Sequence, residues 1–233
     1  MGNNISNKER FPGSVIALDA LIENGARIGE MCRIDSGCQI STDAVIEQNV
    51  ALCQNVQILG DVKIELGSII RENVTLVGPL HIGEGVYIGH DSIIGATRID
   101  ANLSENETVI HESCRIGKQV EIIGGVTVGA FSRIRANAKV IGDVPQYGVV
   151  SRSPAILERF GCPNCGGKLI IKQRSESLLF LGCTACNQTE IKFSSTEWAQ
   201  VPNHVLLPHN QQGKEFISTK GDDLRWLEEW EVR

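Results

Sequence analysis

The sequence IALDALIENGARIGEMCRIDSGCQI (residues 16–40) carries an isoleucine at every sixth position, and this rhythm decides the fold. It continues without a slip as far as residue 94. A period of six matches neither an amphipathic helix, with 3.6 residues per turn, nor an ordinary strand, which alternates every 2.0 residues. The pattern therefore indicates a repeat architecture whose unit is the hexapeptide. Its first positions are Ile16, Ile22, Ile28, Ile34, Ile40, Ile46, Leu52, Ile58, Ile64, Ile70, Leu76, Ile82, Ile88 and Ile94.

Most hexapeptides also have a small or branched residue four places after their first position, as in Ala20, Cys38 and Val56. Two inward positions per segment suit one short strand followed by one turn. Three segments then close a triangular coil of 18 residues, and coils stack at roughly 4.8 Å, the spacing of hydrogen-bonded strands. Each coil buries its apolar corner residues only against the neighbouring coils, so a single coil is not stable and the stack is. The sequence predicts an all-β parallel β-helix.

The rhythm is interrupted once and then resumes. The next first-position residue after Ile94 is Ile110, sixteen residues on where we expect eighteen, and the polar segment Asp100–Glu107 (DANLSENE) is predicted to be a loop outside the coil. Such a loop on a rigid scaffold is either a binding element or an inert surface excursion. Pro145 cannot donate a ladder hydrogen bond and is expected to end the stack, with a short helix over Ala155–Arg159. The second run of first positions is Ile110, Ile116, Ile122, Val128, Ile134 and Val140.

Composition narrows the class of protein. The chain has 233 residues, 42% of them hydrophobic, and a net charge of −6, which argues against nucleic acid as the main partner. No apolar run approaches the ~20 residues of a membrane span, and no secretion signal is evident, so we expect a cytoplasmic protein. The start Met1–Ser6 (MGNNIS) matches the short myristoylation pattern, but that pattern is weak and the sequence favours a polar, disordered leader.

The eight cysteines form two groups. Cys32, Cys38 and Cys114 occupy small inward positions of their hexapeptides, where a free thiol behaves as a small apolar residue, and Cys53 follows Leu52 at a turn. The other four form two CxxC knuckles, seventeen residues apart. Four thiolates at this spacing suit tetrahedral zinc, with a redox dithiol as the alternative, and leave no open position for catalysis. The predicted ligands of a structural zinc ribbon are Cys162, Cys165, Cys183 and Cys186.

These features divide the chain into five parts. A hairpin is expected within the ribbon, from Leu169–Ile171 and Leu178–Leu181, and the polar tail with its three tryptophans is expected to pack on the ribbon or on a neighbouring subunit. The predicted parts are a polar leader (1–14), the β-helix (15–148), a connecting segment (149–160), the zinc ribbon (161–195) and a C-terminal tail (196–233).

One histidine stands out by its context. His90 follows Ile88 by two positions and is predicted to lie on the outside of a turn. A neutral imidazole there can take a proton from an attacking amine or hydroxyl, and a neighbouring carboxylate can fix its tautomer. Asp91 is adjacent in sequence, and Glu72 lies one coil earlier on the same edge. By position alone, an exposed turn histidine is most often inert. His81, predicted in a turn on another edge, and His204 and His209 in the tail are expected to be surface residues.

The segment IGHDSIIG (residues 88–95) resembles the HDC-x-IG motif of the hexapeptide-repeat acyltransferases. The resemblance extends over residues 15–155 and includes the sugar N- and O-acetyltransferases of bacillosamine and sialic acid synthesis and the lipid A acyltransferases. It implies a left-handed parallel β-helix, a homotrimer, and transfer of an acetyl or similar group from coenzyme A to a sugar or nucleotide-linked sugar. It also implies that His90 is the general base and Asp91 its catalytic partner, whereas Glu72 is a catalytic candidate through its register alone.

The closing segment VTVGAFSRIRANAKVIGDVPQYGVVSRSPA (residues 126–155) is similar to the last coils of these enzymes, along which coenzyme A runs. The resemblance implies that Gly129, Ala130 and Arg135 bind the cofactor. Arg152 stands where the family has a glycine, and this replacement either contacts the CoA phosphates or blocks the cofactor. His111, just after the excursion, is a candidate substrate-binding residue. The chain departs from the family twice: Gly89 stands where the bacillosamine-type enzymes have Glu, and Ser151–Ala155 (SRSPA) replaces the usual V-G-x-P-A.

Two other functions remain open from the sequence. A gamma-type carbonic anhydrase would want a further histidine about five residues after His90, where Gly95 stands. A non-catalytic scaffold would use the β-helix as a rigid spacer and the ribbon as the docking module for a protein partner.

Overall fold

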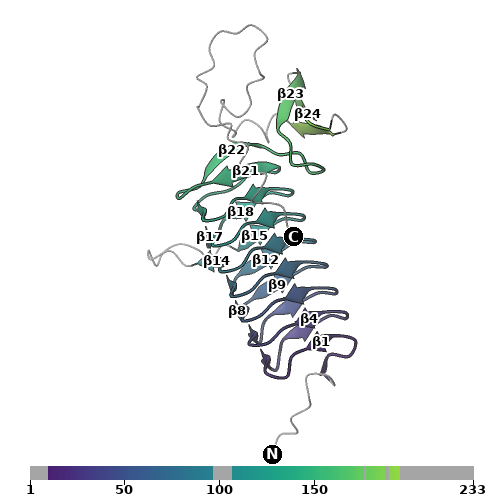
Figure 1. Ribbon diagram of the computed structural model, residues 1–233, viewed down its shortest axis with the longest axis vertical. Coiled ribbons are helices and arrows are strands. Elements are labelled where there is room, and N and C mark those ends of the chain that lie inside the picture. The colour runs from purple at the N-terminus through teal and green to yellow at the C-terminus, as the bar shows by residue number, and fades with distance from the viewer. Residues whose placement is uncertain (1–9, 97–106, 176, 187–188, 195–233) are drawn as a thin grey trace, which may run out of the picture.

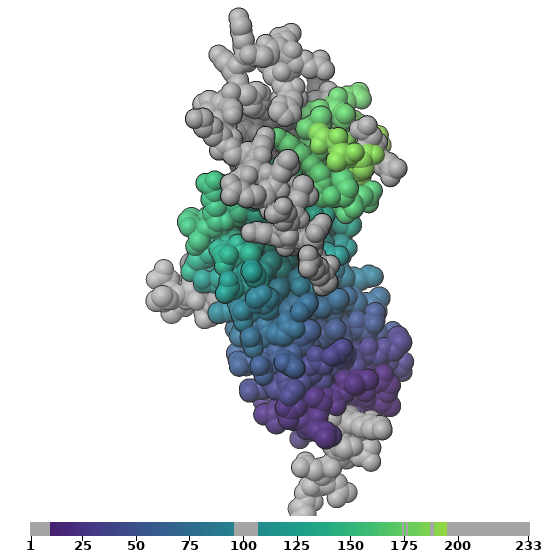
Figure 2. Space-filling model, viewed as in Figure 1, coloured from purple at the N-terminus to yellow at the C-terminus, as the bar shows by residue number. Residues whose placement is uncertain are grey.

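The computed structural model describes residues 10–96, 107–175, 177–186 and 189–194, and these residues form a parallel β-helix followed by a small three-stranded ribbon. The predicted all-β architecture is confirmed. Figure 1 shows the coils stacked along the long axis, with the ribbon at the end opposite the first coil, and Figure 2 shows the same elongated body in space-filling form. Within the described part of the chain, no helix has the length and apolarity that crossing a membrane requires.

Three parallel sheets form the sides of the helix, and we name them A, B and C in the order in which the chain visits them. Sheet A contains β1 (Val15–Ile16), β4 (Arg33–Ile34), β7 (Ala51–Leu52), β10 (Ile69–Ile70), β13 (Tyr87–Ile88), β16 (Arg115–Ile116), β19 (Arg133–Ile134), β21 (Gly148–Ser151) and β22 (Ile156–Phe160). Sheet B contains β2 (Leu21–Ile22), β5 (Gln39–Ile40), β8 (Gln57–Leu59), β11 (Thr75–Val77), β14 (Ile93–Ala96), β17 (Glu121–Ile123) and β20 (Lys139–Val140). Sheet C contains β3 (Arg27–Ile28), β6 (Val45–Ile46), β9 (Val62–Ile64), β12 (Leu80–Ile82), β15 (Thr108–Ile110) and β18 (Thr127–Val128).

The first-position residues of the hexapeptides form the core. From Ile34 to Val140 their side chains are at most 2% exposed, whereas Ile16, Ile22 and Ile28 of the first coil are only partly buried. Full burial of one such side chain contributes about 1.5–3 kcal/mol. The first coil has a neighbour on one side only, which explains why its three isoleucines are less completely covered.

The excursion after β14 adds residues without disturbing the register. Ile64 pairs with Ile82 at a spacing of 18 residues, and Ile82 pairs with Ile110 at a spacing of 28. Ile110 therefore begins the next hexapeptide after Ile94, with ten extra residues between them. The expected spacing of eighteen residues from Ile94 was wrong, because eighteen separates neighbours in the same sheet, whereas consecutive hexapeptides are six residues apart. The predicted loop lies outside the described residues apart from Glu107, and β14 ends in an irregularity between Ile94 and Ala96.

Two expectations for the end of the stack were wrong. Sheet A continues past Pro145, because β21 pairs in parallel with β19. The predicted helix over Ala155–Arg159 is instead the strand β22, which pairs antiparallel with β21. A single turn of helix is marginal in water, whereas the open edge of β21 offers a row of unpaired backbone groups. Pairing in the sheet therefore decides the conformation of this segment.

The ribbon contains β23 (Leu169–Arg174), β24 (Leu178–Cys183) and β25 (Glu190–Ser194) in one antiparallel sheet. The predicted hairpin is confirmed as β23–β24, and β25 was not predicted. Aromatic rings join the ribbon to the last coil: Tyr147 stacks on Phe131 at 5.3 Å between centroids and meets Phe193 edge-on at 5.8 Å. The described part of the ribbon thus shares a small core with the end of the β-helix.

The core cysteines are buried as expected and provide a test of the fold. Burial raises the pKa of Cys38 to about 11 and that of Cys114 to about 12. Each folded-state pKa lies above the unfolded value, so the folded state holds more protons between the two values, and stability falls as pH rises above about 9.

We expect iodoacetamide at pH 8 to modify neither the Cys38 nor the Cys114 thiol in the native protein and both in guanidinium. Peptide mapping by mass spectrometry measures this, and equal labelling of native and unfolded Cys114 would contradict the buried position.

Candidate active site and metal centre

His90 lies in the turn between β13 and β14, at the corner where sheet A passes into sheet B, which we call the A–B corner. Its Nδ1 lies 2.7 Å from Oδ2 of Asp91, and the two side chains are 44% and 41% exposed. An ionised carboxylate can only accept a hydrogen bond, so the Nδ1 nitrogen carries the proton. In this tautomer of the neutral imidazole, the Nε2 nitrogen bears the lone pair that a general base needs.

Asp91 is the carboxylate that orients this imidazole. Its hydrogen bonds hold its pKa below the usual value, first the bond with His90 and second the bond from the side-chain amide of Asn73. A carboxylate that stays ionised at neutral pH can stabilise an imidazolium formed during a reaction. The pairing of His90 with Asp91 is therefore suited chemically to proton transfer.

Glu72 is near His90 by register but is engaged elsewhere. Ile70 pairs with Ile88, which brings Glu72 level with His90 on the neighbouring coil, and its backbone carbonyl accepts the Asp91 amide at 3.0 Å. The Glu72 carboxylate, however, pairs with Arg71 at 3.0 Å, and this contact is the main reason that its pKa is lowered. The structure thus pairs His90 with Asp91, and Glu72 contributes its main chain.

Gly89, the first departure from the family motif, is required by the packing of the coils. A Cβ atom built on Gly89 would lie 2.6 Å from the Gly117 carbonyl carbon and from the Lys118 nitrogen, both main-chain atoms. A glutamate at this position has no room. The carboxylate that pairs with the histidine comes from the following residue instead.

This close approach predicts that Gly89→Ala destabilises the protein. Main-chain atoms of the next coil would have to shift, and overpacking of this kind typically costs about 1–3 kcal/mol. Gly142→Ala is the matched control, because nothing lies within 4 Å of a Cβ built there. Chemical denaturation of the two variants measures the difference, and equal free energies of unfolding would contradict the expected clash.

The four residues expected to bind coenzyme A lie at two different corners. Arg135 and Arg152 follow β19 and β21 at the A–B corner, on the C-terminal side of His90. Gly129 and Ala130 follow β18, where sheet C passes into sheet A, which we call the C–A corner. The structure therefore groups the two arginines with His90 and separates the other two residues from it.

The Arg135 guanidinium already has an acidic partner. Its Nη2 lies 3.3 Å from Oε2 of Glu158 on β22, and the hydroxyl of Ser151 also donates to Glu158. Both side chains of the ion pair are largely buried, at 21% and 24% exposed. An anionic ligand that binds Arg135 would have to displace or share this contact.

His111 lies away from His90. It follows β15 at the C–A corner, and its backbone amide donates to the Val128 carbonyl at 2.9 Å. It therefore shares a corner with Gly129 and Ala130 rather than with the His90–Asp91 pair. The excursion leaves from β14 and returns at β15, which is the third corner of the coil.

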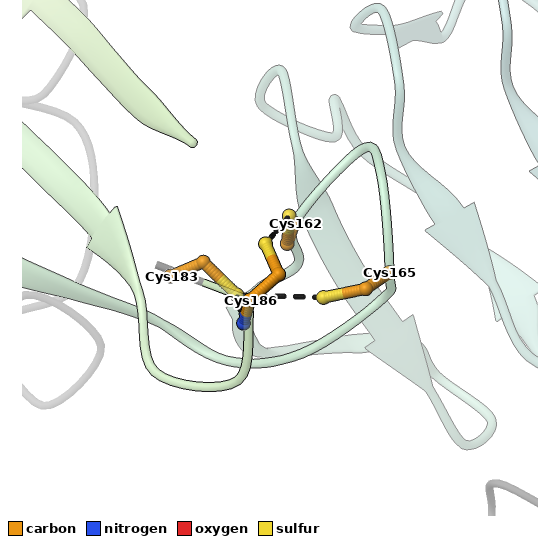
Figure 3. A group of neighbouring side chains, drawn as sticks. All are labelled: Cys162, Cys165, Cys183 and Cys186. Carbon is orange, nitrogen blue, oxygen red and sulfur yellow. Dashed lines mark hydrogen bonds between the residues drawn. The ribbon is translucent and has the colours of Figure 1, made fainter. Parts of the chain in front are cut away.

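The four ribbon cysteines meet in one cluster, shown in Figure 3. All four Sγ atoms lie within 4.8 Å of one another, with Cys162 and Cys186 at 3.8 Å and Cys165 and Cys183 at 3.5 Å. Zinc with sulfur ligands at about 2.3 Å in a tetrahedron requires sulfur–sulfur distances of about 3.8 Å. The cluster has that size, and Cys162 and Cys183 are fully buried.

The surroundings of the cluster suit thiolate ligands. The backbone amides of Ala185 and Cys186 donate to the Cys183 sulfur at 3.3 and 3.5 Å. Arg133 of the β-helix donates to the Cys162 carbonyl at 3.4 Å, and so brings a positive charge to the edge of the cluster. Four thiolates around one divalent ion carry a net charge of −2, and these donors offset it.

Comparison with known proteins agrees with this fold. No protein-family model matches the chain. Serine acetyltransferase 2 of Arabidopsis thaliana is 35% identical over 78 residues, which are 34% of this chain and 24% of the relative. The bifunctional protein GlmU of Pelobacter propionicus is 28% identical over 147 residues, which are 57% of this chain and 32% of the relative. The chain thus spans only a quarter to a third of these curated relatives.

Solved structures with the same architecture include acetyltransferases. The polysialic acid O-acetyltransferase OatWY matches 61% of this chain and 82% of its own with 15% identity and a TM-score of 0.50. A mutant of perosamine N-acetyltransferase from Caulobacter crescentus, solved with CoA and GDP-perosamine, matches 61% and 55% with 19% identity and a TM-score of 0.43. This chain therefore has the hexapeptide-repeat β-helix fold that is found among acetyltransferases.

Proposed function

We propose that the chain is a CoA-dependent acetyltransferase that acts on an amine or hydroxyl of a sugar or nucleotide-linked sugar. The observation that carries the proposal is the pairing of His90 Nδ1 with the Asp91 carboxylate at 2.7 Å on the surface of the β-helix. The substrate class follows from the resemblance of residues 88–95 to the sugar acetyltransferases, and the polysialic acid O-acetyltransferase with the same fold supports it.

The chemistry follows from the orientation of His90. Nε2 takes the proton from the acceptor nitrogen or oxygen while that atom attacks the thioester carbonyl carbon of acetyl-CoA. Asp91 stabilises the imidazolium that forms. Collapse of the tetrahedral intermediate breaks the carbon–sulfur bond, and the imidazolium returns the proton to the leaving CoA thiolate. One base and correct alignment of the two substrates suffice for this reaction.

The remaining roles are parts of the same proposal. Arg135 and Arg152 offer positive charge to the CoA phosphates near His90, with Glu158 as the group that Arg135 must release. Gly129, Ala130 and His111 share the C–A corner, so in a homotrimer they would serve a site formed with a neighbouring subunit. We propose that the β-helix of residues 15–148, together with Arg152 from the segment that follows it, is the catalytic unit and acts in the cytoplasm. Residues 161–195 would hold a structural zinc on the four cysteines.

The direct test combines binding and turnover. A thermal-shift titration with acetyl-CoA should raise the melting temperature, because a ligand of the native state stabilises it by mass action. Release of CoA thiol should then be measured with a panel of nucleotide-linked amino sugars and hydroxyl acceptors. A protein with neither an acetyl-CoA shift nor thiol release across the panel would overturn the proposal.

A non-catalytic scaffold is the second candidate, and the Arg135–Glu158 ion pair favours it, because that pair occupies an arginine that CoA would use. This candidate predicts the absence of acetyl-CoA binding together with a stable protein partner for the ribbon. Glu158→Gln separates the two, since it should tighten CoA binding in an enzyme and leave a scaffold unable to bind CoA.

A further inference from the structure

A row of polar side chains runs along the A–B corner directly to Asp91. Asn55, Asn73 and Asp91 occupy the same turn position on three successive coils, 18 residues apart, with φ angles of 58°, 57° and 57°. Asparagine and aspartate tolerate this left-handed conformation better than most residues. Each of the three backbone amides donates to a carbonyl of the preceding coil at 2.9–3.0 Å. The three side chains therefore leave the stack in the same direction.

These side chains form a continuous hydrogen-bonded ladder that ends at the imidazole. The Asn55 Nδ2 atom donates to Asn73 Oδ1 at 3.1 Å, and Asn73 Nδ2 donates to Asp91 Oδ1 at 3.0 Å. The other Asp91 oxygen, Oδ2, meets His90 Nδ1 at 2.7 Å. One carboxylate thus has one oxygen for the ladder and one for the histidine.

The direction of the ladder is fixed at its charged end. An ionised Asp91 can only accept, so Asn73 must turn its NH₂ group toward it. The carbonyl oxygen of Asn73 then faces Asn55, which must present its own NH₂ group. Every amide in the row is oriented by this requirement, and the bond from Asn73 to Oδ1 leaves Oδ2 of Asp91 facing His90.

We propose that Asn73 is a positioning residue that holds the Asp91 carboxylate against His90 Nδ1, with Asn55 holding Asn73 in turn. The proposal rests on the proposed function for its effect on turnover, but the hydrogen-bonded row stands independently of it. Asn73 acts through Asp91 and touches no substrate. Its contribution is to keep the imidazole proton on Nδ1 and the lone pair on Nε2.

The test uses two substitutions of Asn73 in the full-length protein. Asn73→Gly removes the side chain while glycine adopts the left-handed turn freely. Asn73→Asp keeps the size but replaces the donor by a second carboxylate facing Asp91. We expect kcat to fall about three- to tenfold in Asn73→Gly, the size of one exposed hydrogen bond, and further in Asn73→Asp, with the KM for acetyl-CoA unchanged.

Imidazole nitrogen NMR supplies the readout that a merely structural role would not move. At a pH where the imidazole is neutral, the ¹⁵N shifts of His90 should report its single proton mainly on Nδ1 in the natural protein. In the Asn73 variants they should report an exchange between the Nδ1 and Nε2 tautomers. Asn137→Gly is the matched control. Asn137 has the same turn conformation, with φ 61°, and its backbone amide donates to the Lys118 carbonyl on the preceding coil. We expect it to leave both kcat and the His90 shifts unchanged.

The outcomes are separable. His90 shifts in both Asn73 variants that equal those of the natural protein overturn the proposal, even if kcat falls. If His90→Ala retains turnover, the proposed function fails, yet the tautomer measurement still decides whether Asn73 positions Asp91.

Discussion

Replacing His90 with alanine is expected to lower the turnover number for acetyl transfer by about 10²–10⁴-fold, the usual contribution of a general base. The melting temperature should change little, because the His90 side chain is 44% exposed and lies outside the apolar core. Asp91→Asn should cause a comparable loss, because an asparagine amide can donate to Nδ1 and so leave the proton on Nε2, which then has no lone pair for the acceptor. Thiol release at saturating acetyl-CoA measures both variants.

The chain provides its own control for this experiment. His81 on β12 also pairs with a carboxylate, since its Nε2 lies 2.9 Å from Glu65 Oε1, and its side chain is 32% exposed. It lies in sheet C, away from the A–B corner. His81→Ala should leave turnover within about twofold of the natural protein. Near-normal turnover in His90→Ala would show that this histidine is not the base.

Removing the metal is expected to unfold the ribbon and leave the β-helix folded. Structural zinc in small Cys-rich modules binds with an apparent free energy of about 10–16 kcal/mol, and this binding free energy contributes directly to folding of the module. Cys183→Ser should lose both the metal and the protection of backbone amides in β24 and β25. The amides of β4 to β13 should stay protected, because their hydrogen bonds lie within the stack.

Two measurements check this expectation. Elemental analysis should find one zinc per chain in the natural protein and much less in Cys183→Ser, and hydrogen exchange with mass spectrometry should locate the loss of protection. Cys53→Ser is the matched control, since Cys53 lies in the β-helix far along the chain from the cluster. A natural protein without zinc, or a chelated ribbon that stays protected, would contradict the predicted metal centre.

Much of the fold could be predicted because one physical constraint repeats in the sequence. Each first-position residue, such as Ile34 or Ile70, must face the axis of the coil. The period of six therefore predicts where each short strand lies in the sequence. Strand β22 could not be found in this way, since Ile156–Phe160 has no repeat, and only the open edge of β21 makes it a strand. Strand β25 likewise depends on its partner β24.

The candidate site was only partly visible in the sequence. The sequence motif identified His90, and the 18-residue spacing placed Glu72 on the neighbouring coil. The spacing of the two CxxC pairs predicted the cluster of four cysteines. The choice of Asp91 over Glu72 could not be predicted, because it depends on Arg71 taking the Glu72 carboxylate. The ladder through Asn73 left a signal, the 18-residue spacing of Asn55, Asn73 and Asp91, but their hydrogen bonds depend on turn geometry that the sequence does not state.

Strand β22 also sets the length of the solenoid. A parallel stack can in principle grow without limit, since its last strand presents the same unpaired groups as every strand before it, and a second molecule could add its first coil there. The reversed direction of β22 covers that edge of sheet A with a strand that no parallel coil can extend in register. The same short reversal that redirects the chain into the ribbon thereby ends sheet A, so that a second molecule cannot continue this sheet as a parallel stack.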